Sequence, residues 1–364
     1  MPKPQISYKY LKGINKIKRI ITPPAPERIK RLNFAVTYHC NSRCKTCSIW
    51  KKYRQDSSQA TQELSLDQIK RFFNGARCFD NLDEINLTGG EPFSRRDFQE
   101  IYQYLRHRFP RTTIVIVTNG LTIMDGWIVG KEDILWSVLI FSLDGLEKTN
   151  DAIRGVKGSY QRVIKAVNHY KKIFPALKLG LSFTILPDNY HELRKIYKLS
   201  CEMDLSFTMR FASMSGTYYS NSGIKLAWTE EMLNKAQLAI QSVINDLAHS
   251  RKRLYRLLNP DLFFFSKMVS YKKDERRLFR CHSGTHSLFL DPYGNVHACI
   301  FSEKPLGNIV DTPFDRIWFS EETRQKRGSI ARAECHCWTE CETIPSLQRN
   351  LGDIIRTGKR LKNQ

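Results

Sequence analysis

The chain lacks any apolar stretch long enough to cross a membrane, and it is poor in acidic residues. Its longest apolar run, around residues 134–143, is about half of the ~20 residues that a transmembrane helix needs. Residues 1–31 contain no apolar core of the kind that a secretory signal requires. Asp and Glu number 36 against 58 Lys and Arg, which gives a formal net charge of +22. We therefore expect a cytoplasmic protein with strongly basic segments.

Cysteine is also scarce. Ten cysteines in 364 residues are too dilute for a disulfide scaffold, and a chain of this length builds its core without disulfides. With 41% hydrophobic and 26% charged residues, the composition excludes a disordered chain, a collagen and a long coiled coil. The cysteines are unevenly placed, however, with three in residues 40–47 and three in residues 335–341. In a reducing compartment such clusters more often bind metal or carry out redox chemistry than form structural disulfides.

Short β-branched runs alternate with longer amphipathic stretches from about residue 33 to residue 213. The predicted strands are residues 32–37, 84–87, 113–117, 137–143, 178–186 and 206–212. The predicted helices include residues 65–76, which Ser65 caps, together with residues 96–109, 159–174 and 189–203. Six strand–helix units with near-continuous apolar strands predict a parallel sheet buried on both faces. The fold class is therefore α/β, a partial (β/α)6 barrel of the TIM type, with its functional rim at the C-terminal ends of the strands.

The pattern changes after residue 213, where a polar stretch leads into a helix predicted for residues 229–258. A strand, a turn and a second strand are then predicted within residues 287–300. We expect five segments: a basic, helical N-terminal extension (1–31), the barrel (32–215), a helical basic connector (216–280), a small cysteine-rich domain (281–343) and a basic C-terminal helix (344–364).

The first cysteine cluster directly follows the first predicted strand, in the sequence Cys40-Asn-Ser-Arg-Cys44-Lys-Thr-Cys47. Three thiolates within eight residues can hold three corners of a [4Fe–4S] cluster and leave one iron open to another ligand. A zinc site with a ligand from elsewhere and a Cys44–Cys47 redox pair are the alternatives.

Three further segments match a known family in the right order. Gly89-Gly90-Glu91-Pro92 follows the second strand, Thr118-Asn119-Gly120 ends the third, and Ser142-Leu-Asp144-Gly145 ends the fourth and is followed by Arg154. Together with the CxxxCxxC loop they resemble the radical S-adenosylmethionine (SAM) superfamily.

The resemblance implies a [4Fe–4S] cluster on Cys40, Cys44 and Cys47 that binds SAM. It implies that the GGEP motif contacts the SAM amino group, Ser142 the ribose and Arg154 the carboxylate, with Asn119 also at the site. The family usually has an aromatic residue just before the third cysteine, where this chain has Thr46. Packing against the adenine then falls to Ile49, to Trp50 or to backbone groups.

The second cysteine cluster resembles the SPASM and twitch domains of the same superfamily. Cys281, Gly294 and Cys299 have the spacing of the start of such a domain, and Cys337 and Cys341 match its CX3C element. This resemblance implies one auxiliary [4Fe–4S] cluster on these four cysteines, with Cys335 as the alternative ligand and a structural zinc site as the competing interpretation. The two remaining cysteines, at positions 78 and 201, are predicted to be ordinary buried thiols.

In the family, reductive cleavage of SAM gives a 5′-deoxyadenosyl radical that abstracts a substrate hydrogen. We therefore expect an oxidoreductase acting on a small or lipid-linked alcohol, sugar or amine by dehydrogenation, epimerisation or rearrangement, with electron transfer through the auxiliary cluster. The candidate proton donors or acceptors are Asp144, Arg210, Tyr218 and Tyr219. A peptide-modifying maturase is the alternative, although only 39 residues precede Cys40. A non-enzymatic metal-binding protein that docks on a polyanion is the alternative of another class.

Most of the excess positive charge lies in residues 1–31, 246–281 and 344–364. In the first and last of these, apolar residues recur every three to four positions among lysines and arginines, which is typical of a basic amphipathic helix. Such helices either pack on the barrel with their charges in water or bind an anionic membrane surface. The other partners we expect are SAM and an electron donor such as flavodoxin or ferredoxin. No nucleic-acid-binding module is recognised, so nucleic acid is not an expected partner.

Overall fold

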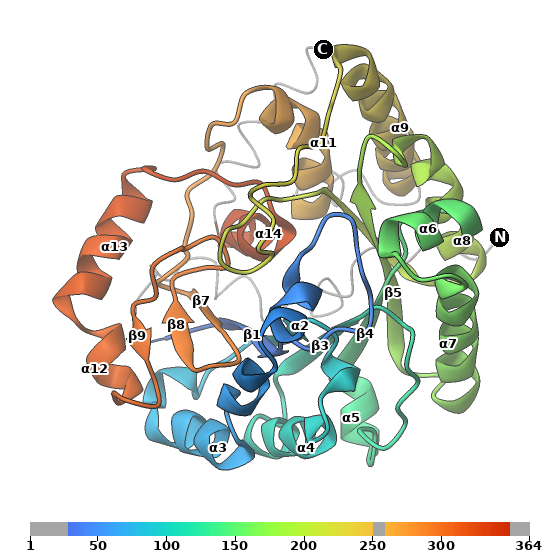
Figure 1. Cartoon of the computed structure of the whole chain (residues 1–364). Coiled ribbons are helices and arrows are strands. Elements are labelled where there is room, and N and C mark those ends of the chain that lie inside the picture. Colours follow the sequence, from blue (N-terminus) through green and yellow to red (C-terminus); the bar gives the residue numbers. More distant parts are fainter. Residues whose placement is uncertain (1–27, 250–258, 350–364) are drawn as a thin grey trace.

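A nine-stranded sheet forms the centre of the protein (Figure 1). The computed structural model describes residues 28–249 and 259–349. Six parallel strands follow one another in chain order, which confirms the predicted partial barrel. They are β1 (Arg31–Thr37), β2 (Glu84–Gly89), β3 (Thr113–Thr118), β4 (Ser137–Ser142), β5 (Lys178–Ile185) and β6 (Ser206–Phe211).

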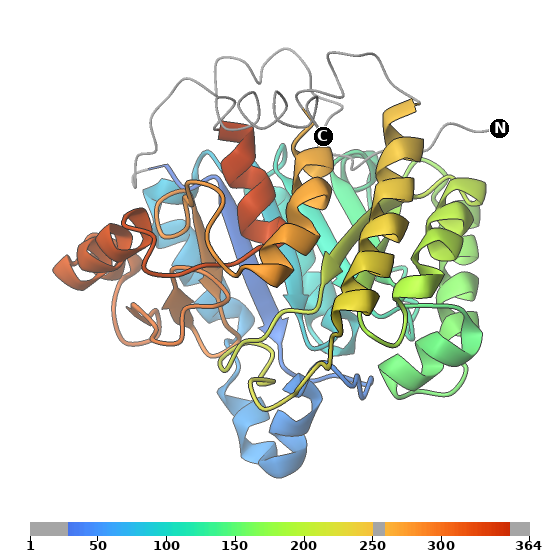
Figure 2. The ribbon, with the colours of Figure 1, turned by 90° about the horizontal axis from the view of Figure 1, so that it is seen from above.

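Helices cover the outer face of the barrel and flank its open side. Between the strands lie α2 (Lys52–Gln55), α3 (Leu66–Gly75), α4 (Phe98–Arg108), α5 (Lys131–Leu135), α6 (Glu147–Arg154), α7 (Ser159–Ile173) and α8 (Leu193–Glu202). After β6 follow α9 (Glu230–His249), α11 (Pro260–Lys273), α12 (Phe314–Trp318), α13 (Glu321–Ala331) and α14 (Glu340–Arg349). Ser65 caps α3 as predicted, in a reciprocal capping box with Gln68. Figure 2 shows α14, α11 and α9 side by side, and α11 also contacts β6.

The two faces of the six-stranded sheet differ in chemistry. Outward-facing residues such as Leu32 and Phe34 of β1 belong to the main hydrophobic core under the helices. Inside the barrel, Val115, Val138 and Ile140 form a small apolar group with Val117 packed against it. Further inner positions are polar and include Asn33, Asn86, Ser182 and Thr208. The prediction of near-continuous apolar strands is therefore wrong for this face, because β1, β2, β5 and β6 alternate polar and apolar residues.

The cysteine-rich segment extends the barrel sheet. Its strands are β7 (Ser287–Leu290), β8 (Asn295–His297) and β9 (Gly307–Asn308). β7 pairs in parallel with β1, with Arg31 opposite Ser287 and Phe34 opposite Leu290, and β8 and β9 continue the sheet in antiparallel fashion. At the other end of the segment, α14 runs across the boundary that we drew at residues 343 and 344.

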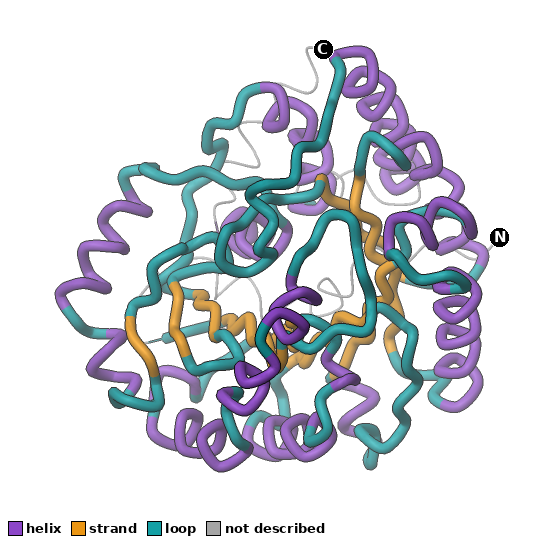
Figure 3. The backbone as a smooth tube through the Cα atoms, viewed as in Figure 1, coloured by secondary structure: helices purple, strands orange, loops and turns teal. Residues whose placement is uncertain are grey.

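The basic ends predicted from the sequence fall mostly on residues 1–27 and 350–364, outside the described residues, as does the end of the predicted helix at 250–258. Among the described helices, none combines the length and apolar character that crossing a bilayer demands. Figure 3 shows loops gathered over the mouth of the barrel, where the C-terminal ends of β1 to β6 meet.

Candidate active site

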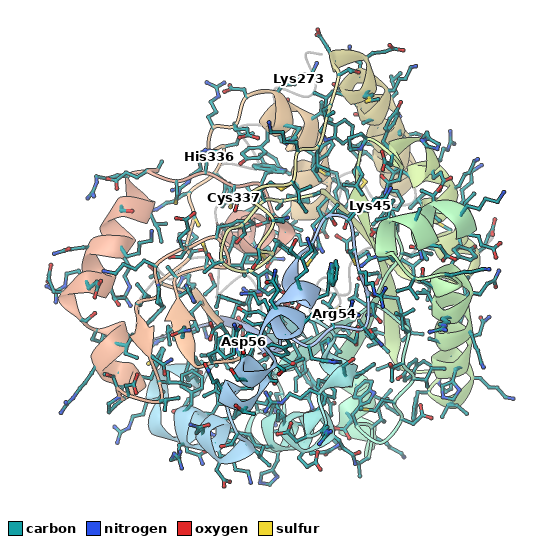
Figure 4. The ribbon with its side chains drawn as sticks, viewed as in Figure 1. Lys45, Arg54, Asp56, Lys273, His336 and Cys337 are labelled. Carbon is teal, nitrogen blue, oxygen red and sulfur yellow. The ribbon has the colours of Figure 1, made fainter. Side chains whose placement is uncertain are left out.

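The first cysteine loop lies across the mouth of the barrel, directly after β1. Cys40, Cys44 and Cys47 line one cavity of about 130 Å³. The loop is fixed by backbone hydrogen bonds, because the amide of Arg43 donates to the carbonyl of Arg154 at 2.9 Å and the amide of Ser48 donates to the carbonyl of Tyr219, also at 2.9 Å. Figure 4 labels Lys45 on this loop. The barrel rim therefore holds three thiols at one opening.

These three thiols have the chemistry of metal ligands. Burial raises the pKa of Cys40 and of Cys47 to about 12, and it also raises the pKa of Cys44. Buried thiols become thiolates when a bound cation compensates the charge, so metal binding and deprotonation occur together. A guanidinium nitrogen of Arg154 lies 3.9 Å from the sulfur of Cys44. Three partly buried thiols that line one cavity fit a cluster that takes three protein ligands.

The two glycines after β2 are required by the neighbouring strand. A Cβ on Gly89 would lie 2.1 Å from the carbonyl oxygen of Thr37, and a Cβ on Gly90 would lie 2.2 Å from that of His39. The amide of Gly90 also donates to the Thr37 carbonyl at 2.8 Å. Both glycines line the cavity, but their small size serves the close approach of β2 to the chain that leads into the cysteine loop.

Glu91 does not line this cavity, contrary to its expected contact with SAM. Its side chain is fully buried and accepts hydrogen bonds from the hydroxyl of Thr118 at 2.8 Å, from the amide of Asn119 at 2.6 Å and from the amide of Phe93 at 3.1 Å. Burial raises the pKa of Glu91 to about 7. Pro92 is buried behind it, in the first turn of a short helix. Glu91 thus ties the end of β2 to the end of β3.

The other predicted SAM contacts do line the cavity. Asn119 and Ser142 reach it from the ends of β3 and β4, and Thr46, Ile49 and Trp50 reach it from the cysteine loop. The side-chain amide nitrogen of Asn119 donates to the side chains of Asn41 at 2.7 Å and Ser42 at 3.0 Å. Both candidates for packing against an adenine, Ile49 and Trp50, are therefore available at the site.

Arg154 and Asp144 form a buried ion pair at the cavity wall. Their nearest atoms are 2.6 Å apart, and the other Asp144 oxygen accepts from the amide of Thr184 at 2.7 Å. Asp144 is a predicted proton donor or acceptor, and both of its oxygens are engaged, one by Arg154 and the other by Thr184. The Arg154 guanidinium still lines the cavity, beside Cys44.

A second cavity, of about 150 Å³, lies deeper in the barrel. Arg210, Tyr218 and Tyr219, the other three candidates, line both cavities. The Tyr218 side chain is held at the barrel wall, because its hydroxyl oxygen lies 2.9 Å from the hydroxyl oxygen of Thr88. Its ring centroid lies 4.7 Å from the ring centroid of Tyr219. Burial raises the pKa of Tyr219 to about 12. Arg210 is ion-paired with Glu340 of α14.

The structure brings together the four cysteines predicted to hold an auxiliary cluster. All four side chains are partly buried. Burial, and then the negative charges of the three neighbouring thiolates, raise the pKa of Cys337. Burial raises the pKa of Cys281 to about 11 and that of Cys341 to about 12. Figure 4 shows Cys337 at the start of the segment that leads into α14. Cys335, the alternative ligand, is exposed, and its sulfur accepts from Arg277 at 2.9 Å.

Within residues 28–249 and 259–349, no group of three or more His, Cys, Asp and Glu side chains is placed to hold a single metal ion. A [4Fe–4S] cluster takes one thiolate at each of its four corners. The last two cysteines occupy positions consistent with ordinary thiols: Cys78 is buried and lies 3.6 Å from Asp315, and Cys201 packs against the main core.

A buried carboxylate stands beside the second group of thiols. Glu342 accepts hydrogen bonds from the hydroxyls of Ser283 at 2.5 Å and Ser287 at 2.7 Å, and its charge contributes to the raised pKa of Cys281 and Cys341. Arg31 of β1 donates to the carbonyl of Cys341 at 2.8 Å. The second thiol group is thereby anchored to the first strand of the barrel.

Sequence reasoning missed Glu340 and Ser182, which both line the deeper cavity. Glu340 lies between Cys337 and Cys341, and only the cysteines of this motif were predicted to have a role. Ser182 occupies an inner position of β5, and the alternation of polar and apolar residues in that strand was the available signal.

Comparisons with known proteins agree with this geometry. Residues 34–200 match the model of the radical SAM superfamily, and residues 281–342 match that of the SPASM iron–sulfur cluster-binding domain. The chain is 25% identical over 300 residues to the Fe-coproporphyrin III synthase of Methanosarcina barkeri, covering 78% of this chain and 72% of the relative. It is also 25% identical over 330 residues to the mycofactocin maturase MftC of Mycolicibacterium smegmatis, covering 85% and 76%.

Among solved structures, SuiB of Streptococcus suis bound to S-adenosylmethionine has a TM-score of 0.61 at 15% identity, covering 83% of this chain and 68% of that one. The structure of anSMEcpe with bound S-adenosylmethionine has a TM-score of 0.56 at 15% identity, covering 91% and 99%. These two likenesses concern the fold. With both family models matched in the expected order along one continuous sheet, the chain belongs to the radical SAM superfamily and is an enzyme that carries a SPASM domain.

Proposed function

We propose that this radical SAM enzyme abstracts a hydrogen atom from a small or lipid-linked alcohol, sugar or amine, and that the auxiliary cluster exchanges an electron with the substrate. The net reaction is then a dehydrogenation, an epimerisation or a rearrangement. The observation that carries the proposal is the position of the deeper cavity. Tyr219 and Arg210 line both this deeper cavity and the thiol-lined cavity above it. Cys341 lines the deeper cavity from the other side.

Each thiol group has its own part in this proposal. Cys40, Cys44 and Cys47 hold the cluster that binds SAM, and the other group, listed as Cys281, Cys299, Cys337 and Cys341, holds one auxiliary [4Fe–4S] cluster. When bound, the two cofactors supply the 5′-deoxyadenosyl radical and an electron acceptor or donor. Arg154, oriented by Asp144, binds the SAM carboxylate, and Asn119 and Ser142 face the nucleoside.

The size of the deeper cavity supports a small reacting group. Its volume of about 150 Å³ is below the ~300–1,000 Å³ of common ligand pockets. A hydroxyl- or amine-bearing end of a larger molecule would fit, so a lipid-linked substrate is compatible with the site.

The test begins with anoxic reconstitution with iron and sulfide. With a strong reductant, the protein should convert SAM to 5′-deoxyadenosine and methionine, measured by liquid chromatography and mass spectrometry. Metabolites and lipids that accumulate on gene deletion, prepared with deuterium, should then transfer deuterium into 5′-deoxyadenosine. Absence of SAM cleavage in protein that contains both clusters would overturn the proposal.

A peptide-modifying maturase is the second candidate. It is favoured by the likeness to the mycofactocin maturase MftC, which extends over 85% of this chain. A peptide would need to place one side chain in the deeper cavity while its backbone lies at the barrel mouth. Deuterium transfer from a peptide encoded beside the gene, and from no small alcohol or amine, would favour this candidate.

We also propose a cytoplasmic location, an electron donor such as flavodoxin or ferredoxin, and docking of the basic ends on an anionic membrane surface. The support for docking is the excess of Lys and Arg in residues 1–31 and 344–364. Sedimentation with anionic vesicles and absence of sedimentation with neutral vesicles is the expected result. Equal recovery in the supernatant with both kinds of vesicle would contradict it.

A further inference from the structure

The deeper cavity is polar on one wall. Ser182 of β5 pairs in register with Ser142 of β4 on one side and with Thr208 of β6 on the other. Three hydroxyl-bearing residues therefore lie at one level across neighbouring strands. The lining also has an apolar part, which includes Val115 and Ile140. A bound molecule thus meets hydrogen-bonding groups along the wall formed by these strands.

Two buried polar atoms of this lining have no partner. The hydroxyl oxygen of Ser182 and one carboxylate oxygen of Glu340 are both buried and make no hydrogen bond within the described residues. The other Glu340 oxygen is ion-paired with Arg210. A buried polar atom without a hydrogen bond is unfavourable, so the native protein gains stability when a ligand supplies the missing bond.

The chemistry of these atoms selects a ligand. Glu340 is ion-paired with Arg210, and the oxygens of a carboxylate paired in this way accept hydrogen bonds. Its partner must therefore be a donor. The Ser182 hydroxyl can donate or accept, so a hydroxyl or an ammonium group satisfies both atoms. A carboxylate-bearing group would meet the negative charge of Glu340 instead.

We propose that Glu340 and Ser182 bind a hydroxyl or ammonium group at the reacting end of the substrate, and that they set the specificity of the enzyme. This proposal rests on the proposed function and narrows it to substrates whose reacting end carries a hydrogen-bond donor. Ligand binding would bridge α14, which carries Cys341, to β5 of the barrel. The reacting carbon would then be held between the two thiol groups.

The experiment uses the reconstituted holoenzyme with SAM, reductant and carbon-deuterated ethanolamine as the probe. Perdeuterated dimethoxyethane, which has no hydrogen-bond donor and is longer by a methyl group at each end, is the comparison probe. We expect deuterium in 5′-deoxyadenosine from ethanolamine at about ten times the level found with dimethoxyethane, because the ether can accept a hydrogen bond from Ser182 but cannot donate one to Glu340. Binding of ethanolamine is measured in parallel by ligand-observed NMR, without reductant.

Three variants locate the effect. Glu340→Gln should lower both the deuterium transfer from ethanolamine and its binding about tenfold, and Ser182→Ala should lower them severalfold. Ser200→Ala is the matched control, because Ser200 is equally buried but its hydroxyl donates to the Tyr197 carbonyl in α8. It should match the wild type. Iron content and the EPR signals of both clusters are compared in all proteins. If Glu340→Gln loses a cluster, the result with Ser182→Ala alone tests the proposed binding role.

The outcomes separate this inference from the proposed function. Protein with both clusters that does not cleave SAM refutes the proposed function. SAM cleavage without deuterium from ethanolamine, or with equal deuterium from both probes, refutes the role of Glu340 and Ser182 and leaves the proposed function standing. Wild-type binding and transfer in both Glu340→Gln and Ser182→Ala would refute it as well.

Discussion

The two thiol groups of this protein are built in opposite ways. Cys40, Cys44 and Cys47 lie in one loop of eight residues at the mouth of the barrel, and they face a cavity. The second group, whose members are Cys281, Cys299, Cys337 and Cys341, is assembled from segments up to 60 residues apart and is closed by α14. Three thiols at an opening leave a coordination position for SAM, whereas four enclosed thiols favour electron transfer over direct substrate binding.

The charges around the two groups differ as well. An arginine, Arg154, lies beside Cys44, whereas a carboxylate, Glu342, lies among the four thiols of the second group. A positive neighbour suits a site that binds the carboxylate of SAM. A buried negative neighbour makes it harder to add an electron to the auxiliary cluster. The comparison teaches that one group is arranged for ligand binding and the other for setting a redox potential.

The largest effect is expected from Cys44→Ala. Removal of one of only three ligands should abolish SAM cleavage and lower the iron content from about eight to about four atoms per chain. Product analysis and iron determination measure the two effects. Cys78→Ala, which removes a buried thiol beside Asp315, should retain both properties. Undiminished cleavage by Cys44→Ala would contradict the ligand assignment.

Cys299→Ala tests the role of the second thiol group. We expect loss of about four irons but SAM cleavage within a few-fold of wild type, while turnover of the substrate to product stops for want of an electron acceptor. Cys335→Ala is the control, because Cys335 is exposed and contacts Arg277. If Cys335→Ala also loses four irons, the auxiliary ligand set must include it.

Gly90→Ala tests how the open loop is held. A Cβ at this position would lie 2.2 Å from the His39 carbonyl, so the end of β2 or the cysteine loop must shift. We expect the free energy of unfolding to fall by roughly 3 kcal/mol, measured by anoxic thermal unfolding. Gly75→Ala, in α3 with no atom within 4 Å of the new Cβ, should be neutral or slightly stabilising. Equal stability of the two variants would show that the loop adapts.

The smallest effect is expected from Glu342→Gln, which sharpens the electrostatic difference. Removal of a buried negative charge beside the auxiliary cluster should raise its reduction potential by some tens of millivolts, measured by EPR-monitored redox titration. The potential of the SAM cluster should not change, and it serves as the internal reference. A shift confined to the SAM cluster would reverse the assignment of the two sites.

Local features of the fold were predictable from the sequence. The strands begin and end within about two residues of their predicted positions, and the capping of α3 by Ser65 depends only on the adjacent Gln68. The motif residues Cys40, Asn119 and Ser142 meet at one rim because parallel strands bring their C-terminal ends together.

Tertiary contacts were not predictable in the same way. The partners of Glu91 and Asp144 come from neighbouring strands, so only the structure shows that these carboxylates are engaged. The polar inner wall is an intermediate case. Residues 206–211, Ser-Phe-Thr-Met-Arg-Phe, alternate strictly, and this period of two predicts a polar face. The ion pair of Glu340 with Arg210 joins residues 130 positions apart, for which no local pattern exists.

The parallel pairing of β7 with β1 determines how the protein can be dissected. All seven residues of β1 are buried, and one of its two edges is covered by the cysteine-rich segment. A truncation before residue 281 would expose that edge as a row of unpaired amides and carbonyls flanked by apolar side chains, which is a template for aggregation. The SPASM segment therefore also covers an edge of the catalytic barrel, and its removal would leave β1 unpaired on that side.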